Sequence, residues 1–291
     1  MKKLFSIVIC VMALLFVGCK PNNSDKPIST YKAKAFSVSP SKQVYFSKGN
    51  LQYTQSTKRW SFAENQWEII GTDNVTGGNV ESQPELSFGC GDKKEGNSLA
   101  DKVDLFGWST SSTNFGVSTS TNSSDYSFSS FVDWGTNKIG NDAPNTWRTL
   151  TYKEWDYVVL NRPNASSLNG VAQVNGVNGL VLLPDNWTCP SGVTFKSGSH
   201  REYAVEAYRK YQTFTARQWS KLESAGAVFL PAAGIRSGTG VHGVQCDGEY
   251  WSATERRSHY ADCLYFVSRL ACMDFSGRRY GHCVRLVKDV Q

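Results

Sequence analysis

The sequence predicts an α+β fold made of short antiparallel strands, two main helices and long loops. Most apolar residues fall in short alternating or continuous runs that end at Pro, Gly or Asn, a pattern typical of short strands. Only two segments combine a helix-initiating motif with helical spacing of apolar residues. Strand and helix patterns do not alternate regularly, so a parallel α/β sheet is not expected. About 270 residues follow the predicted leader, enough for one large domain.

The first strands are expected between residues 35 and 53, where apolar and polar residues alternate. Pro40 and the polar residues 48–50 divide this segment, so two strands are predicted. Residues 71–98 and 108–130 are rich in Ser, Thr, Asn and Gly, and we expect them to form long surface loops. The apolar residues of the two predicted strands are Phe36, Val38, Val44, Phe46 and Leu51.

Two capping boxes predict the main helices. Thr151 with Glu154 begins the first helix, and Thr215 with Gln218 begins the second. Gly226 is placed to end the second helix. After each helix start, some way along the chain, comes an apolar run with the length of a buried strand, which ends at a proline. These runs are residues 180–184 and 227–231.

The amino terminus has the pattern of a bacterial lipoprotein signal. Lys2 and Lys3 precede an apolar stretch, residues 4–17, which is too short to span a bilayer stably. Gly18-Cys19 then completes a lipobox-like ending. We expect residues 1–18 to be a signal peptide, Cys19 to carry lipid, residues 19–34 to be a polar tether and residues 35–291 to form the domain. The alternative is an uncleaved anchor helix. Lys20, where an inner-membrane retention signal has Asp, favours the outer membrane and the cell surface.

Charge and cysteine content narrow the classes of partner. The formal net charge of +6 includes two leader lysines, so about +4 remains on the processed chain. That charge is too small and too scattered to predict nucleic-acid binding. Six cysteines remain beyond Cys19, but three of them fall in one unusual segment, so we do not expect a disulfide framework to hold the fold together. The four histidines lie far apart, so neither a dedicated metal site nor a cofactor is expected.

The unusual segment is residues 256–283. It contains five Arg, three Cys and two His, but no Lys, Glu, Gln, Asn or Trp. Arg, Tyr, Phe and His are residue types found where surfaces bind, whereas a merely solvated face mixes Lys and Glu with Arg. Every residue type in the segment except that of Met273 has a codon ending in cytosine, as random replacement of the first two bases of Asn codons would leave. The alternative is an idiosyncratic terminal segment.

Five ordered motifs carry a family resemblance. They are Trp147-Arg-Thr-Leu-Thr-x-x-Glu-Trp-x-Tyr157, Gly179-Leu-Val-Leu-Leu-Pro-Asp-Asn-Trp187, Ala225-Gly-Ala-Val-Phe-Leu-Pro-Ala-Ala-Gly-Ile-Arg236, Tyr250-Trp-Ser-Ala-Thr254 and Gly281-x-x-Val284-Arg285-Leu286. Together they resemble Bacteroides-type exported lipoproteins with a C-type-lectin-like fold, related at a distance to the formylglycine-generating, sulfatase-modifying fold. Some members resemble variable proteins of diversity-generating retroelements, whose C-terminal region is rewritten at Asn codons. This chain departs from that pattern in having no Asn beyond Asn186.

The resemblance implies a surface-displayed ligand-binding lipoprotein with a variable region at about residues 250–286. Its partners would be an unknown protein or glycan on a cell or phage surface, and the membrane through the N-terminal lipid. A fixed-specificity adhesin or fimbria-associated lipoprotein of the same fold is the alternative. An enzyme is not expected, because the spacing of Cys263 and Cys272 matches no reactive-cysteine motif of the distant relatives and random neighbours would not activate a thiol.

Alternation and the motif match divide the segment into a buried frame and a binding face. The frame residues are expected to be Trp251, Leu264, Phe266, Val284 and Leu286. Arg278, Arg285 and Tyr265 fit either group. The ligand-binding residues are expected to be Arg256, Arg257, Ser258, His259, Asp262, Cys263, Val267, Arg269, Ala271, Cys272, Asp274, Phe275, Arg279 and His282.

Overall fold

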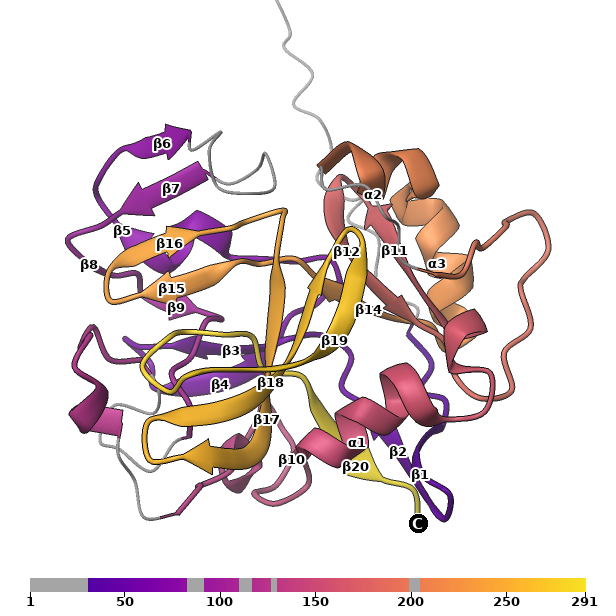
Figure 1. The fold of residues 1–291 in the computed structure, drawn as a ribbon, viewed down its shortest axis with the longest axis horizontal. Coiled ribbons are helices and arrows are strands. Elements are labelled where there is room, and N and C mark those ends of the chain that lie inside the picture. The colour runs from indigo at the N-terminus through magenta and orange to yellow at the C-terminus, as the bar shows by residue number, and fades with distance from the viewer. Residues whose placement is uncertain (1–30, 83–91, 110–116, 127–129, 199–204) are drawn as a thin grey trace, which may run out of the picture.

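The chain folds as a mixed α+β structure, as predicted, with mostly antiparallel strands in several sheets and few helices. The computed structural model describes residues 31–82, 92–109, 117–126, 130–198 and 205–291 (Figure 1). The predicted signal peptide, Cys19 and most of the tether lie outside these residues and stay predictions. Among the helices of the described residues, none combines the length and the apolar character needed to cross a bilayer.

One sheet joins the two ends of the described chain, in the order β1-β2-β20-β10 with antiparallel pairing throughout. Residues 35–53 contribute three strands instead of the predicted two, because the chain turns both at Pro40 and at residues 48–50. A Cβ on Gly49 would lie 2.4 Å from the Ala63 carbonyl oxygen, so the second turn requires glycine. The strands are β1 (Phe36–Ser39), β2 (Lys42–Phe46), β20 (Leu286–Asp289) and β10 (Arg148–Thr149), while β3 (Leu51–Thr54), β4 (Arg59–Phe62) and β9 (Lys102–Val103) form a separate sheet.

The two predicted apolar runs pair with each other in a second four-stranded sheet, where Leu180 lies opposite Leu230. The sheet has the order β13-β11-β12-β14. The predicted capping box of Thr215 and Gln218 is present, and the helix it begins buries Trp219 completely against this sheet. The elements are β11 (Asn169–Val174), β12 (Val177–Leu182), β13 (Thr213–Phe214), β14 (Val228–Pro231), α2 (Val205–Tyr211) and α3 (Ala216–Ser224).

The segment 71–98, predicted to be a loop, contains short strands that pair with distant partners. These strands are too short and too polar to show the alternation by which strands are recognised in a sequence. Within segment 108–130 the described residues include a 3₁₀ turn. The elements are η1 (Gly71–Asn74), β5 (Val75–Thr76), β6 (Val80–Ser82), β7 (Asp92–Glu95), β8 (Ser98–Leu99) and η2 (Ser123–Tyr126), with β15 (Ile235–Ser237) and β16 (Gly240–His242) beside β7.

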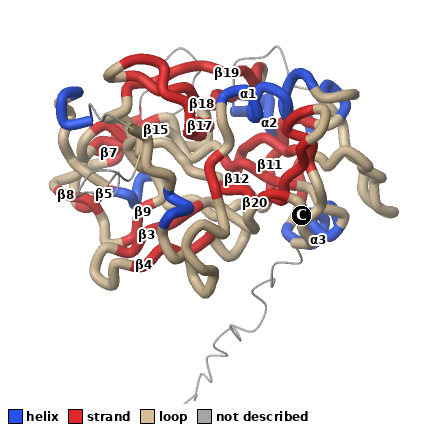
Figure 2. The backbone as a smooth tube through the Cα atoms, turned by 90° about the horizontal axis from the view of Figure 1, so that it is seen from below, coloured by secondary structure: helices blue, strands red, loops and turns tan. Residues whose placement is uncertain are grey.

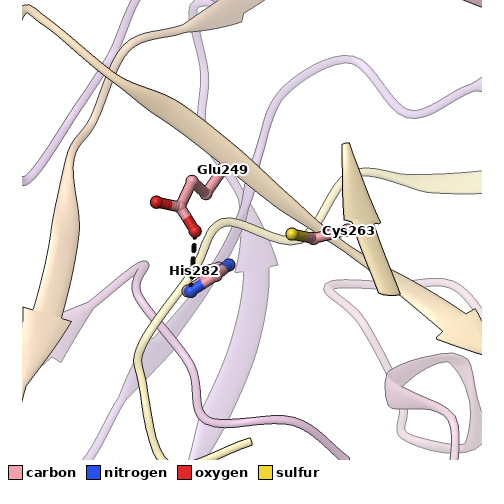
Figure 3. A group of neighbouring side chains, drawn as sticks. All are labelled: Glu249, Cys263 and His282. Carbon is pink, nitrogen blue, oxygen red and sulfur yellow. Dashed lines mark ion pairs between the residues drawn. The ribbon is translucent and has the colours of Figure 1, made fainter. Parts of the chain in front are cut away.

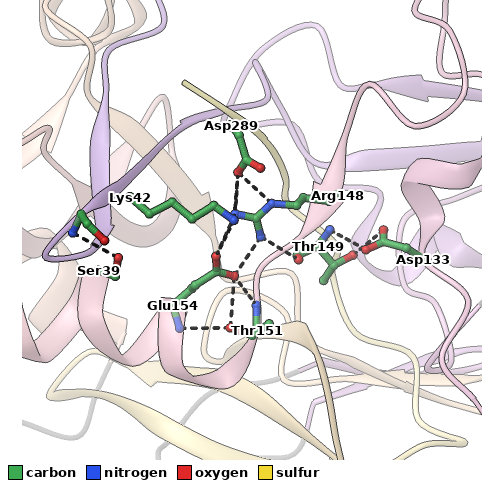
Figure 4. Close-up of polar contacts among 9 residues, drawn as sticks. Ser39, Lys42, Asp133, Arg148, Thr149, Thr151, Glu154 and Asp289 are labelled. Carbon is green, nitrogen blue, oxygen red and sulfur yellow. Dashed lines mark hydrogen bonds and ion pairs between the residues drawn. The ribbon is translucent and has the colours of Figure 1, made fainter. Parts of the chain in front are cut away.

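The first predicted helix, α1 (Tyr152–Asp156), begins at its capping box and continues into a π-helical turn, η4 (Tyr157–Asn161). Glu154 also receives two hydrogen bonds of 2.8 Å from Arg148, which in turn binds Asp289 (Figure 4). Lys42 lies within ion-pair distance of the same two carboxylates. This network ties the start of α1 to the sheet that holds both ends of the chain. Two short 3₁₀ turns, η3 (Trp134–Thr136) and η5 (Ala165–Ser167), flank the region.

Asp104 is a fully buried carboxyl group, and its protonation makes the stability of the fold depend on pH. It accepts hydrogen bonds from the Ile70 backbone N–H at 3.0 Å and from Asn74 Nδ2 at 2.9 Å. Burial raises the pKa of Asp104 to about 6, although these hydrogen bonds act to lower it. The folded state therefore binds the proton more tightly than the unfolded state. The stability that protonation contributes is present below pH ~4 and is lost as the pH rises to about 6.

We expect Asp104→Asn to remove this pH dependence. Relative to the variant, the wild type should lose about 2–3 kcal/mol of unfolding free energy between pH 4 and pH 7, since each pKa unit corresponds to about 1.4 kcal/mol. Urea unfolding at pH 4, 5, 6 and 7 measures the difference. Asp101→Asn, at an exposed carboxylate of the neighbouring segment, is the control. A difference between wild type and Asp104→Asn that stays constant over this range would contradict the prediction.

The final sheet consists of β17 (Gly248–Arg257), β18 (Tyr260–Val267) and β19 (Leu270–Gly277), joined by two tight turns. In Figure 2 this sheet forms one outer edge of the molecule, with β3 and β4 at the opposite edge. The sheet contains most of the compositionally unusual segment, so the fold gathers those residues on one layer.

Candidate functional site

The register of the outer sheet places successive residues on opposite faces. Leu264 lies between Tyr250 of β17 and Met273 of β19, while Cys263 lies between Trp251 and Asp274. The middle strand, β18, is paired along both edges, whereas β19 is paired on one side only. Side chains of β18 are therefore enclosed by neighbours, and exposed side chains are expected mainly on β19 and at the turns.

Both faces of this sheet pack against cores. Tyr250, Leu264 and Phe266 join the cluster around Phe46 and Trp155, and Trp251 belongs to a second cluster. All five residues predicted for the frame are completely buried, which confirms that part of the prediction. The confirmed residues are Trp251, Leu264, Phe266, Val284 and Leu286.

Four residues predicted for the binding face are buried, so their assignment as exposed was wrong. Cys263 and Val267 belong to the enclosed middle strand, and each is less than 5% exposed. His282 is completely buried because its ring stacks on Trp251, with the centroids 4.0 Å apart. Asp262 is 7% exposed and pairs with Arg256 Nη1 at 3.2 Å. Strand alternation does not reveal which strand is central, and that position decides burial here.

The other predicted binding residues are exposed or partly exposed, but they divide between the two ends of the sheet. Arg256, Arg257 and Ser258 lie at the β17–β18 turn, and Arg269 lies at the β18–β19 turn at the opposite end. The edge strand β19 connects the two groups. The exposed members are Arg256, Arg257, Ser258, Asp274 and Phe275, and the partly buried members are His259, Arg269, Ala271, Cys272 and Arg279.

An exposed cluster of three side chains, Arg256, Tyr260 and Phe275, forms at the first end. The Arg256 guanidinium lies over the Phe275 ring, 4.2 Å from its centroid, and Tyr260 contacts the same ring edge to face at 5.7 Å. Tyr260 is 42% exposed and Phe275 46% exposed. A cation, a phenol and an apolar ring thus share one surface, a combination enriched in the residues that dominate binding energy. We call these residues the Arg256–Tyr260–Phe275 cluster.

Arg278, which fitted either group in the sequence, is a completely buried frame residue below this cluster. It donates hydrogen bonds to the carbonyl oxygens of Arg257 at 2.7 Å and Tyr260 at 3.3 Å, and it pairs with Glu255. Its guanidinium also lies 4.4 Å from the centroid of the Trp108 ring. These contacts hold the β17–β18 turn in one shape from beneath, so the exposed side chains are presented on a rigid support.

A second cluster lies at the inner side of the same sheet and consists of Glu249, Cys263 and His282 (Figure 3). His282 Nε2 is 3.0 Å from Glu249 Oε2, and the Cys263 sulfur points toward the imidazole ring. One possible ligand atom from each residue lies within 4.8 Å of those of the other two. The three residues come from β17, β18 and the segment before β20, so only the folded chain brings them together. We call them the Glu249–Cys263–His282 cluster.

Negatively charged groups and burial together determine the pKa values in this cluster. Burial acts to raise the pKa of Glu249, but the neighbouring His282 outweighs it and lowers that pKa. Burial raises the pKa of the Cys263 thiol well above its usual value, and the charges of Glu249 and Asp274 add to the effect. Burial, with Asp274, also raises the pKa of Cys272. Neither thiol has the lowered pKa of a reactive nucleophile.

The sequence did not indicate two contributors to the site. Glu249 precedes the unusual segment and lies 14 and 33 positions from its partners, so no metal-binding spacing marks it. Tyr260 was not among the predicted site residues, although an exposed aromatic residue beside Arg is a recognisable signal. Among the described cysteines, Cys189, Cys263, Cys272 and Cys283 are free, and Cys246 is disulfide-bonded.

Comparisons of this chain with protein-family models, with curated proteins and with solved structures each found no match.

Proposed function

We propose that the protein is a surface-displayed ligand-binding lipoprotein whose C-terminal face varies between isolates while its frame stays constant. The observation that carries the proposal is the distribution of exposed apolar side chains. Of the five large apolar residues that are exposed among those described, three lie on the β18–β19 hairpin, Tyr260, Leu270 and Phe275, and two of them, Tyr260 and Phe275, contact each other beside Arg256. Exposed apolar groups that gather beside arginine mark binding surfaces, whereas scattered single ones need no explanation.

The separation of buried and exposed residues supports variability. Within one continuous segment the frame residues are completely buried, and the exposed side chains lie at the ends of β17 and β18, at the turn between them and on the edge strand β19. Replacing an exposed side chain usually changes stability by less than ~0.5 kcal/mol, whereas truncating a buried aromatic residue costs about 3–5 kcal/mol. The exposed positions can therefore change without loss of the fold. A C-type-lectin-like frame with retroelement-driven replacement, as the motifs suggest, is the specific form of the proposal.

The exposed residues favour a partner with anionic and apolar groups. Arg256 and Arg257 offer planar forks of donors suited to carboxylate, sulfate or phosphate, and Phe275 adds apolar area next to them. Such groups occur on protein and glycan surfaces of cells and phages. Many lipid-anchored copies on one cell would bind multivalently, so weak single contacts suffice.

Sequencing the gene from several isolates tests the proposal. We expect variation to concentrate at exposed positions such as 256, 257, 274 and 275, and Trp251, Leu264 and Phe266 to stay constant. We also expect a neighbouring reverse transcriptase gene and a near-identical template repeat with Asn codons at the variable positions. The measurement is the variability per position, with residues 35–53 of the same isolates as the internal control.

A fixed-specificity adhesin or fimbria-associated lipoprotein is the alternative, and the exposed Arg256–Tyr260–Phe275 cluster fits it equally well. It predicts equal variability in residues 256–283 and 35–53, with no template repeat nearby. That outcome would remove the variable part of the proposal and leave a constant binding surface.

A further inference from the structure

The Glu249–Cys263–His282 cluster contains polar groups that the described residues leave without partners. His282 is completely buried, and its Nδ1 atom has no hydrogen-bond partner among the described residues. Cys263 is buried beside it, and its thiol is free of any disulfide. Buried polar groups are normally satisfied, so an imidazole nitrogen without a partner beside a free thiol requires an explanation. His282 Nε2 lies 3.0 Å from Glu249 Oε2, yet neither ring nitrogen makes a hydrogen bond of normal geometry within the described residues.

The cluster has the chemistry of a metal site. A carboxylate, a thiolate and an imidazole are the three side-chain types that bind Zn²⁺, at about 2.0–2.3 Å from the metal. Tetrahedral geometry puts such ligand atoms roughly 3.4–3.7 Å apart. The observed separations reach at most 4.8 Å, so the three ligand atoms need to close by roughly 1 Å. Small side-chain rotations cover that distance.

The surroundings favour a cation at this position. Asp274 lies directly opposite Cys263 on the edge strand, is exposed, and acts electrostatically on the thiol. The stacking of His282 on Trp251, with the rings 6° from parallel, fixes the imidazole plane. A rigid imidazole, a buried thiol and excess negative charge lower the cost of assembling a cation site.

We propose that Glu249, Cys263 and His282 bind one divalent metal ion of the zinc class, with Asp274 or water in the fourth position. Mixed thiolate and imidazole ligation favours Zn²⁺ over Mg²⁺ and Ca²⁺, which require oxygen ligands. The ion would join β17, β18 and the segment before β20, so its binding would stabilise the outer sheet. This inference does not depend on variability or on the identity of the ligand of the exposed face.

Titration of the full-length protein with zinc chloride, in detergent and without a reducing agent that would open the Cys246 disulfide, tests the proposal. We expect one Zn²⁺ per chain, a rise in melting temperature on addition of the metal, and a thiolate-to-metal charge-transfer band when Co²⁺ replaces Zn²⁺. Loss of an outer-shell partner alone weakens metal sites ~10–100-fold, so Cys263→Ser is expected to weaken Zn²⁺ binding at least ~10-fold and to abolish the Co²⁺ band.

Two further variants keep the test decisive. Glu249→Gln removes a ligand without removing the buried thiol, so it tests the site even if Cys263→Ser fails to fold. Cys189→Ser is the matched control, because Cys189 is an exposed free cysteine on another part of the fold. Stoichiometric binding that Cys263→Ser and Glu249→Gln weaken and Cys189→Ser leaves unchanged supports the site. Absence of binding, or equal binding by wild type and both ligand variants, would overturn it.

Discussion

Arg285→Met is expected to destabilise the protein by about 3–5 kcal/mol, because it removes two buried hydrogen bonds from a charged guanidinium, each of which contributes about 1.5–3 kcal/mol. Arg285 is completely buried and donates hydrogen bonds to Asn50 Oδ1 at 3.1 Å and to Gln66 Oε1 at 2.6 Å. Gln66 Nε2 in turn binds Glu223 at 3.1 Å. The side chain of Gln66 therefore connects a buried cation on the C-terminal segment to a buried anion on α3.

A double-mutant cycle separates the charge effect from the loss of packing. Met approximates the length of the Arg side chain, so the main change in Arg285→Met is the loss of charge and donors. Adding Glu223→Gln removes the buried negative charge that attracts Arg285, so we expect the two substitutions together to cost at least ~1 kcal/mol less than the sum of their separate costs. Urea unfolding measures each term, and Arg257→Met, at an exposed arginine of β17, is the control. A loss below ~1 kcal/mol for Arg285→Met would show that the network contributes little.

Short sequence motifs predicted the helices and strands whose formation depends on residues close together in the sequence. Both capping boxes were found because a Thr and an acceptor three residues later satisfy each other across one turn. The runs around Leu180 and Leu230 were found because a strand buried on both faces is apolar throughout. Strands such as β7 and β16 were missed, since they are held by pairing with distant segments and not by their own residues.

The sequence predicted which segment forms the candidate site, but not which of its residues are buried. The unusual Arg-rich segment was recognised, and Arg256 and Phe275 are exposed as expected. Cys263 and Val267 alternate like surface residues, but they lie on the middle strand, and only sheet order reveals that. Arg278 and Arg285 are of a residue type that is usually exposed, yet both are buried. Each donates hydrogen bonds to oxygen atoms of segments far away in the sequence. Such long-range pairing is not visible in one sequence.

Trp251→Ala and Arg257→Ala, two substitutions in the same strand, are expected to differ widely in their effect on stability. Trp251 is completely buried, donates a hydrogen bond from Nε1 to the Phe106 carbonyl oxygen at 2.6 Å and stacks on His282. Its truncation removes these contacts and leaves a cavity, so we expect a loss of about 3–5 kcal/mol of unfolding free energy. The Arg257 side chain is exposed, and its backbone contact with Arg278 survives truncation, so a change within ~0.5 kcal/mol is expected.

Thermal and urea unfolding of the two variants, with Trp251→Phe as an intermediate step, test whether frame and surface are separable. Trp251→Phe keeps most of the apolar volume but removes one of the two hydrogen bonds that the Phe106 carbonyl oxygen accepts, the other coming from the His282 backbone N–H, so its cost should lie between the other two. A loss of 2 kcal/mol or more for Arg257→Ala would mean that an exposed position also supports the fold. The side chain at position 257 could then not be replaced without loss of stability. The proposal of a variable surface on β17 would lose its physical basis.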